Sequence, residues 1–250
     1  MRTTRLRVGV VLAQHISCDL CLLQTMCSQM FLMLAVLGAL ADATCNRQRA
    51  VWDARTSATS DHNLIIGAGE GTTGTRWLFK VVVDALGSRM TTAMHFTHIE
   101  GRDRTLAKNA LDAMMNLAPS ECDDFDYRVF DSIAYVSDTP IPQFFPYIFK
   151  AYPRAKVILT VRNGSEWARS RINHEHLAPP PFHGATEGLR HAKCERFYPN
   201  LLAAAAYEAY NSMVQCLVPP SQLLVVNVFS ESNESVRRKV AKFLASRDSQ

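Results

Sequence analysis

The chain has 250 residues, of which 48% are apolar and 20% are charged, and its formal net charge is +4. This apolar content is sufficient for a buried core and excludes a disordered chain. The small positive charge fits a local anion site, but the sequence lacks the dense Lys/Arg stripe that a nucleic-acid-binding protein needs. The length accommodates one α/β domain with an N-terminal extension, or two very small domains.

The first 43 residues have the pattern of a targeting segment. Three arginines within the first seven residues precede a mostly apolar stretch, and small residues at 39–43 provide candidate cleavage sites. We therefore expect residues 1–43 to be a signal peptide or signal anchor, and the protein to reach the secretory pathway, either in the Golgi lumen or secreted. The apolar stretch fits a membrane anchor less well than a cleaved signal peptide, because polar residues interrupt it. Delivery to an organelle by a transit peptide is the alternative, because acidic residues are scarce in this segment.

Four of the seven cysteines follow the targeting segment, namely Cys45, Cys122, Cys194 and Cys216. An oxidising compartment allows such thiols to form disulfides. Four thiols have three possible pairings, and the sequence does not choose among them.

The rest of the chain divides into a polar linker over residues 44–61 and a folded domain over residues 62–250. Within the domain, short apolar runs of the length of strands are each followed by a helical stretch. These pairs are 63–66 with 77–86, 156–161 with 165–174, and 223–228 with 234–246. Strands that alternate with helices predict an α/β fold in which a parallel sheet carries helices on both faces.

A segment rich in glycine and threonine, residues 67–77, lies between the first strand and its helix. Glycines let successive backbone N–H groups turn toward an anion, and the N-terminus of the following helix adds a partial positive charge. The spacing from Gly69 to Gly74 matches the start of a nucleoside-triphosphatase phosphate loop, but Thr75-Arg76 stands where Lys-Ser/Thr is required. A metal-dependent ATPase or GTPase is therefore disfavoured. The simpler alternative is that this segment only joins a strand to a helix.

A second candidate for anion binding follows the second strand. Arg162 lies at the carboxyl end of that strand, which is where open α/β sheets bind ligands. Ser170 lies eight residues later, two turns into the next helix. A guanidinium and a hydroxyl together make a suitable clamp for a phosphate. Taken singly, each residue is more typical of a surface ion pair or a solvated helix face.

These segments resemble the sulfotransferase superfamily over residues 62–246. Residues 71–77 look like the loop that binds a 5′-phosphosulfate, Arg162 and Ser170 match the pair that binds a 3′-phosphate, and residues 152–162 look like the YPxAKVILTVR element of a microbial and algal branch. The resemblance implies a three-layer sandwich like that of the P-loop nucleoside triphosphatases. It also implies 3′-phosphoadenylyl sulfate (PAPS) as the donor, without a metal, bound by Gly71, Thr72, Thr73, Gly74, Thr75, Arg76, Trp77, Arg162 and Ser170.

The activity that this resemblance implies is transfer of a sulfuryl group to an unidentified hydroxyl or amine. The expected partner is a small-molecule or carbohydrate acceptor, and no nucleic acid is expected. One alternative is a catalytically degenerate, nucleotide-binding member of the same fold, which is favoured by Thr72 because the family usually has Lys or Arg there. The other is a phosphotransferase like the P-loop kinases.

The family uses a histidine or a carboxylate as the catalytic base. His98 and His95, which follow the loop helix, are the first candidates, ahead of Asp138. A neutral imidazole near pH 7 suits a general base, although an ordinary structural histidine is the alternative at either position. Arg76, at the start of the helix, is our candidate for supplying the charge that Thr72 lacks.

Overall fold

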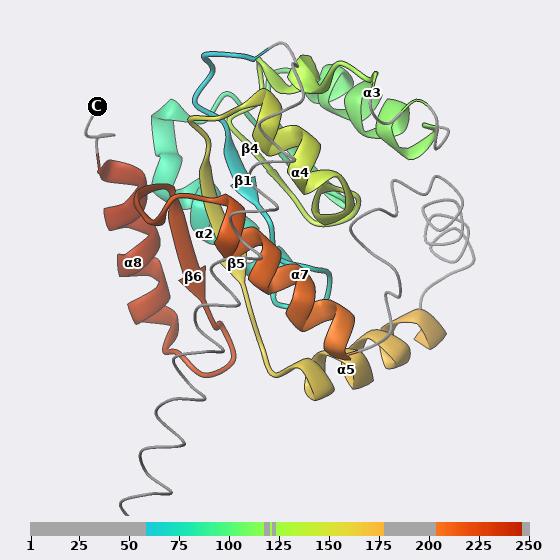
Figure 1. The fold of residues 1–250 in the computed structure, drawn as a ribbon. Helices are drawn as coiled ribbons and strands as arrows, with labels where there is room; N and C mark the ends of the chain where they lie inside the picture. The colour runs from blue at the N-terminus through green and yellow to red at the C-terminus, as the bar shows by residue number, and fades with distance from the viewer. Residues whose placement is uncertain (1–58, 118–120, 122–123, 178–203, 247–250) are drawn as a thin grey trace, which may run out of the picture. The chain divides into compact units, whose positions relative to one another are not determined.

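The computed structural model describes residues 59–117, 121, 124–177 and 204–246, which form a mostly parallel, six-stranded sheet flanked by helices (Figure 1). The strands are β1 (Ile65–Gly67), β2 (Thr92–His95), β3 (His98–Gly101), β4 (Tyr135–Ser137), β5 (Lys156–Thr160) and β6 (Leu223–Val226). The α-helices are α2 (Thr75–Leu86), α3 (Arg104–Met115), α4 (Ile141–Ala151), α5 (Gly164–Leu177), α7 (Ala204–Leu217) and α8 (Asn233–Ala245). Short 3₁₀ helices are η1 (Gly87–Arg89), η3 (Tyr127–Phe130) and η5 (Pro220–Gln222).

The strand order is β3-β2-β4-β1-β5-β6, so the strand that leads into the glycine-rich loop lies inside the sheet. Strands β2, β4, β1, β5 and β6 run parallel, whereas β3 is antiparallel to β2 at one edge. The carboxyl ends of the parallel strands therefore meet at one edge of the sheet. The predicted α/β fold with a parallel sheet between helices is confirmed, and the antiparallel β2–β3 hairpin is an addition to it.

Apolar side chains pack on both faces of the sheet. On one face, α2 and α8 share a core with Ile65 and Ile158. Helices α4 and α7 lie over the other face (Figure 1). There Tyr207 of α7 stacks on Trp167 of α5, with ring centres 4.5 Å apart, and Tyr210 of α7 donates a hydrogen bond to Ala68 O at 2.7 Å. Helix α7 thus supports both the loop after β1 and the helix after β5.

The boundaries of the elements follow their local chemistry. Helix α2 begins at Thr75, two residues before the expected start, because the left-handed Gly74 ends the loop there, and it stops at Gly87 as predicted. Strand β6 ends at Val226 because the side chain of Asn227 accepts hydrogen bonds from the next backbone N–H groups, at 3.0 Å from Phe229 N and 3.2 Å from Ser230 N.

The end of the predicted linker is attached to the domain. Ser60 donates its backbone N–H to Ala151 O at 2.8 Å and its hydroxyl to Asp131 at 2.5 Å. The expected targeting segment, residues 1–43, and the linker up to residue 58 lie outside the described residues. Among the helices that are described, none is both long and apolar enough to cross a bilayer. Cys216 is disulfide-bonded, and the three other candidate cysteines (Cys45, Cys122 and Cys194) lie outside the described residues.

Candidate functional site

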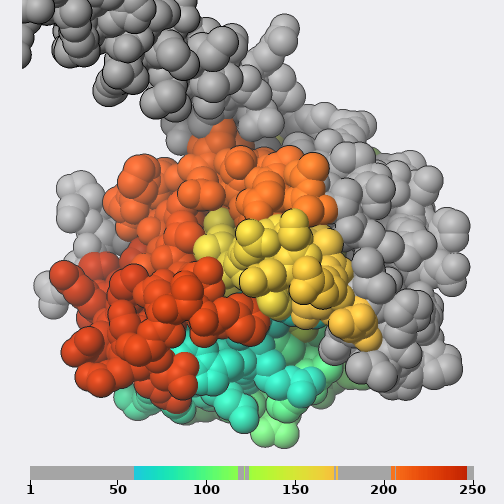
Figure 2. All heavy atoms as spheres, turned by 90° about the horizontal axis from the view of Figure 1, so that it is seen from below, coloured from blue at the N-terminus to red at the C-terminus, as the bar shows by residue number. Residues whose placement is uncertain are grey.

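The candidate site lies where the parallel strands end. Figure 2 is seen from this side, and in it the start of α2, helix α5 and the segment after β6 adjoin one another. Contacts between their residues agree with this view, because the guanidinium of Arg162 lies over the ring of Phe229, 4.4 Å from its centre. Segments that are far apart in the sequence therefore meet around the glycine-rich loop, residues 68–74.

Two glycines in the loop cannot be replaced without strain. A Cβ on Gly69 would lie 2.9 Å from the backbone nitrogen of Thr160 and would also overlap the hydroxyl of Thr160. Gly74 has a φ of +88°, and a Cβ there would collide with Cγ2 of Val228. The loop is thus pressed against β5 on one side and the segment after β6 on the other, as a backbone cradle requires.

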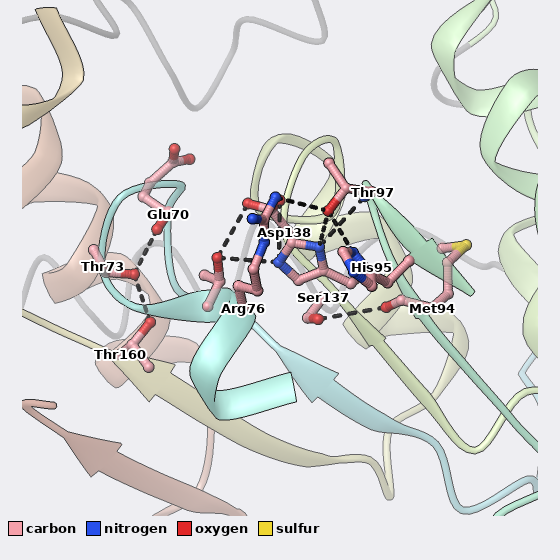
Figure 3. A network of polar contacts seen from close by, with 11 residues as sticks. Glu70, Thr73, Arg76, Met94, His95, Thr97, Ser137, Asp138 and Thr160 are labelled. Atoms are coloured by element: carbon pink, nitrogen blue, oxygen red, sulfur yellow. Dashed lines mark hydrogen bonds and ion pairs between the residues drawn. The ribbon is translucent and has the colours of Figure 1, made fainter. Parts of the chain in front are cut away.

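The loop keeps several donors available for a ligand. In the described part of the chain, no hydrogen bond uses the backbone N–H of Gly71, Thr72 or Gly74. Thr72 has a φ of +69°, and its buried hydroxyl has no partner among the described residues. Thr73 is different, because its hydroxyl bonds Glu70 O at 2.5 Å and the hydroxyl of Thr160 at 2.6 Å (Figure 3). Thr73 therefore holds the loop closed, while the donors of its neighbours make no hydrogen bond within the described part of the chain.

Arg162 lies against this loop, as its place after β5 suggests. Its Nη1 donates to Thr72 O at 3.1 Å, and its backbone N–H donates to the hydroxyl of Tyr207 at 3.0 Å. Its Nε is buried without a partner in the described part of the chain, and its Nη2 lies 3.7 Å from Glu166. Ser170 is half-buried on α5, and its hydroxyl makes no hydrogen bond with another described residue. Both residues therefore retain donors for an anion.

One face of α5 packs on the loop. The indole of Trp167 is fully buried and donates to Gly71 O at 3.0 Å. One turn later, Arg171 is only 3% exposed, and its guanidinium lies beside Gly71. Neither Trp167 nor Arg171 could be recognised as a loop contact from the sequence, because α5 has few apolar residues to mark its buried face.

A second polar cluster joins the loop helix to the ends of β2 and β4 (Figure 3). The Nε2 of His95 lies 3.3 Å from Asp138 Oδ2 and 3.3 Å from the hydroxyl of Thr75. That hydroxyl also donates to Asp138 Oδ1 at 3.4 Å. The side chains of His95 and Asp138 are 3% and 12% exposed, so the carboxylate is the more accessible of the two.

The pKa of His95 lies below its ordinary value of 6.5. Burial is the largest cause, the carboxylate of Asp138 opposes it, and the nearby charges of Arg76 and His98 lower the pKa further. The imidazole is therefore neutral at pH 7. Its Nδ1 accepts from the backbone N–H of Thr97 at 3.4 Å, which assigns the proton to Nε2, facing Asp138.

Of the remaining predicted residues, His98 and Arg76 lie at the rim of this cluster, whereas Trp77 lies beside α8. His98 is exposed, and its Nδ1 is 2.8 Å from the hydroxyl of Thr97. Arg76 is also exposed and donates to the same hydroxyl at 3.3 Å, so it lies on the β2 side of the loop (Figure 3). Trp77 is half-buried, with the guanidinium of Arg237 5.7 Å from its ring centre. The residues described here contain no group of three or more His, Cys, Asp or Glu side chains arranged to hold a metal ion.

Comparison with known families identifies the family of this chain. A profile described as a sulfotransferase domain matches residues 64–234, a range that includes the loop, α5, Asp138 and His95. Comparison with curated proteins gives no match.

The lowered pKa of His95 predicts a pH-dependent stability. The unfolded chain binds a proton on this residue at a higher pH than the folded chain, so the contribution is complete above about pH 6.5 and is lost as the pH falls through the folded pKa. We expect the free energy of unfolding to fall more steeply below pH 6.5 in the parent protein than in His95→Gln. Urea unfolding over a pH series measures this, with Arg89→Gln, an exposed change away from His95, as the control that should keep the parent slope. Identical slopes for the parent and His95→Gln would contradict it.

Gly74→Ala tests how tightly the segment after β6 presses on the loop. Gly74 has a left-handed backbone, with a φ of 88° and a ψ of 20°, which costs an alanine about 1–2 kcal/mol. A Cβ there would also collide with Cγ2 of Val228. We expect Gly74→Ala to lower the free energy of unfolding by roughly 2–5 kcal/mol, as measured by urea unfolding. In the Val228→Ala background, which removes the collision, the same change should cost roughly 1–3 kcal/mol less. Equal losses in the two backgrounds would show that Val228 does not restrict the loop.

Proposed function

The chain belongs to the sulfotransferase family, and from this premise we propose that it transfers the sulfuryl group of PAPS to a hydroxyl or amine of a small-molecule or carbohydrate acceptor. The observation that carries the proposal is the arrangement of donors around the loop. Unused backbone N–H groups at Gly71, Thr72 and Gly74 lie beside Arg162, which keeps an unpaired Nε within the described structure.

The loop fits the 5′-phosphosulfate end of this donor. Backbone N–H groups at the start of a helix bind anions through hydrogen bonds and through the helix dipole. Gly74 carries no side-chain cap for α2, and the hydroxyl of Thr72 is a further donor that has no partner among the described residues. The constraint at Gly69 by Thr160 keeps the loop backbone in place before a ligand arrives.

Arg162 and Ser170 suit the 3′-phosphate. Arg162 is held in place by Thr72 O and Tyr207, while Nε and the weakly engaged Nη2 are left for a phosphate. Ser170 adds a hydroxyl on the adjoining helix. The ring of Phe229, which is 56% exposed and stacks on Arg162, offers a flat apolar surface for the purine. Trp77 at the start of α2 is the second aromatic residue that we assign to the nucleotide.

We assign the general base to Asp138 and the positioning role to His95. The Nε2–H of His95 and the hydroxyl of Thr75 both point at the carboxylate and orient it. Because Nδ1 of His95 already faces the N–H of Thr97, the imidazole has no lone pair left for an acceptor. His98, which is exposed at the rim, is the competing candidate.

In the proposed transfer, Asp138 removes the proton of an acceptor hydroxyl while a new S–O bond forms at the acceptor oxygen. The S–O bond to the 5′-phosphate breaks in the same step, and its electron pair stays on the phosphate oxygen. The products are the sulfated acceptor and adenosine 3′,5′-bisphosphate. Catalysis then depends on positioning and on charge stabilisation, as in phosphoryl transfer.

Thr72 supports a second candidate, a nucleotide-binding protein of the same fold without turnover. A neutral residue at this position removes a cation that the family usually has in the loop. A phosphotransferase like the P-loop kinases is the third candidate. Loss or retention of transfer from labelled PAPS distinguishes the first two, and a requirement for Mg²⁺ and ATP identifies the third.

We also propose that the protein enters the secretory pathway, to reside in the Golgi lumen or be secreted, with residues 1–43 as a cleaved signal or retained anchor. A disulfide at Cys216 suits an oxidising compartment and supports this proposal.

The first prediction from this proposal concerns nucleotide binding. The purified protein should bind adenosine 3′,5′-bisphosphate more tightly than 5′-AMP, because Arg162 and Ser170 bind the 3′-phosphate. Arg162→Ala should weaken binding of the bisphosphate about tenfold or more, since loss of a charged hydrogen bond costs ~1.5–3 kcal/mol. Isothermal titration calorimetry measures this, with the exposed Arg169→Ala on the helix that follows Arg162 as the control. Equal affinity of the parent for both nucleotides would refute the proposed donor.

The second prediction concerns the base. Asp138→Asn should lower sulfuryl transfer about 100-fold, because it removes the group that accepts the proton, and should leave binding of adenosine 3′,5′-bisphosphate within about twofold. The assay follows ³⁵S-labelled PAPS with a panel of phenols, sugars and amines. His98→Gln, the control, should retain transfer. If Asp138→Asn keeps the parent rate of transfer and His98→Gln loses it, His98 is the base.

A further inference from the structure

Helix α5 presents a buried cation to the phosphate loop. Arg171 is only 3% exposed, which is unusual because arginine side chains normally lie at the surface. It lies one turn after Trp167, whose indole donates to Gly71 O, so both residues share the face of α5 that packs on the loop. The position of the guanidinium is therefore defined by an anchored helix.

The guanidinium of Arg171 and the carboxylate of Asp138 lie near the same point of the loop. A Cβ on Gly71 would lie 2.5 Å from Arg171 Nη1 and 3.5 Å from Asp138 Oδ1. Gly71 precedes Thr72, the loop position at which the family usually has a basic residue. Transfer from a leaving phosphate to an acceptor requires a cation for the first and a proton acceptor for the second, and both groups are close to this part of the loop.

The other arginines near the loop are less suited to this role. Arg162 is directed at Thr72 O and Phe229, on the side of the loop that we assign to the nucleotide. Arg76 is exposed and bonded to Thr97. A charge in a buried position acts more strongly on a ligand than an exposed one, because water screens it less. Arginine also stays protonated at any physiological pH.

We propose that Arg171 supplies the positive charge that the loop lacks at Thr72, by binding the 5′-phosphosulfate end of the donor. This inference rests on the proposed function. When the S–O bond breaks, its electron pair stays on the oxygen of the 5′-phosphate, and Arg171 stabilises the negative charge that develops there. A member of the family without a basic loop residue then retains the charge needed for catalysis, delivered from α5.

The test compares three nucleotides by isothermal titration calorimetry. The affinity ratio of adenosine 3′,5′-bisphosphate to adenosine 3′-monophosphate measures the contribution of the 5′-phosphate, and the ratio to 5′-AMP measures that of the 3′-phosphate. In Arg171→Gln the first ratio should fall about tenfold or more, as expected for loss of a charged hydrogen bond, while the second stays unchanged. In Arg162→Ala the pattern should be reversed.

Matched variants separate this role from a structural one. Arg169→Gln, an exposed change of the same kind on α5, should leave both ratios unchanged, and Arg171→Lys should give an intermediate first ratio. If Arg171→Gln does not fold, Arg171→Lys alone decides, and an unchanged first ratio overturns the inference. If the first ratio falls in Arg76→Gln and not in Arg171→Gln, Arg76 supplies the charge. If the parent shows no preference for the bisphosphate over 5′-AMP, the proposed function itself fails, which is a different outcome from an insensitive Arg171.

Discussion

The hydrogen bond from the indole of Trp167 to Gly71 O joins α5 to the glycine-rich loop, and the arrangement of charges around the loop depends on this attachment. The bond is buried, and the indole stacks on Tyr207, so the helix has little freedom to move relative to the loop. Arg162 immediately precedes α5 and Arg171 lies one turn after the indole. The guanidinium of Arg162 therefore reaches the loop at Thr72, and that of Arg171 reaches it at Gly71.

The loop itself is held by contacts that leave its donors free. Thr73 uses its hydroxyl inward, toward Glu70 and Thr160, and Tyr210 binds the carbonyl of Ala68 at the beginning of the loop. A flexible loop would lose conformational entropy on binding an anion, which reduces affinity. Here the loop loses that entropy when the protein folds, because neighbouring elements already hold its backbone while the N–H groups of Gly71, Thr72 and Gly74 make no hydrogen bond in the described part of the chain.

Much of the fold could be predicted from the sequence, because the strands and helices have clear apolar runs. A helix-ending glycine such as Gly87 also marks where an element stops. The loop was also predictable, since its glycines stand between a strand and a helix. The β2–β3 hairpin was not, because Phe96-Thr97 is not a typical turn pair. The roles around Asp138 depend on which strands are neighbours in the sheet, and this order is a tertiary property. Burial of Glu70 and Arg171 was equally invisible, since charged residues are normally expected at the surface.

The sheet order also separates the two ends of the proposed site. The proposed donor end uses β1, β5 and α5, whereas His95 lies on β2, with β4 between β2 and β1. The β2–β3 hairpin is the edge of the sheet beside His95, and its connection is only two residues long, Phe96 and Thr97. Because this connection lies at the edge, lengthening it would leave the pairing of the parallel strands unchanged. The part of the site that we assign to the nucleotide is therefore fixed within the sheet, and the part that we assign to the acceptor borders on a turn whose length is not constrained by the sheet.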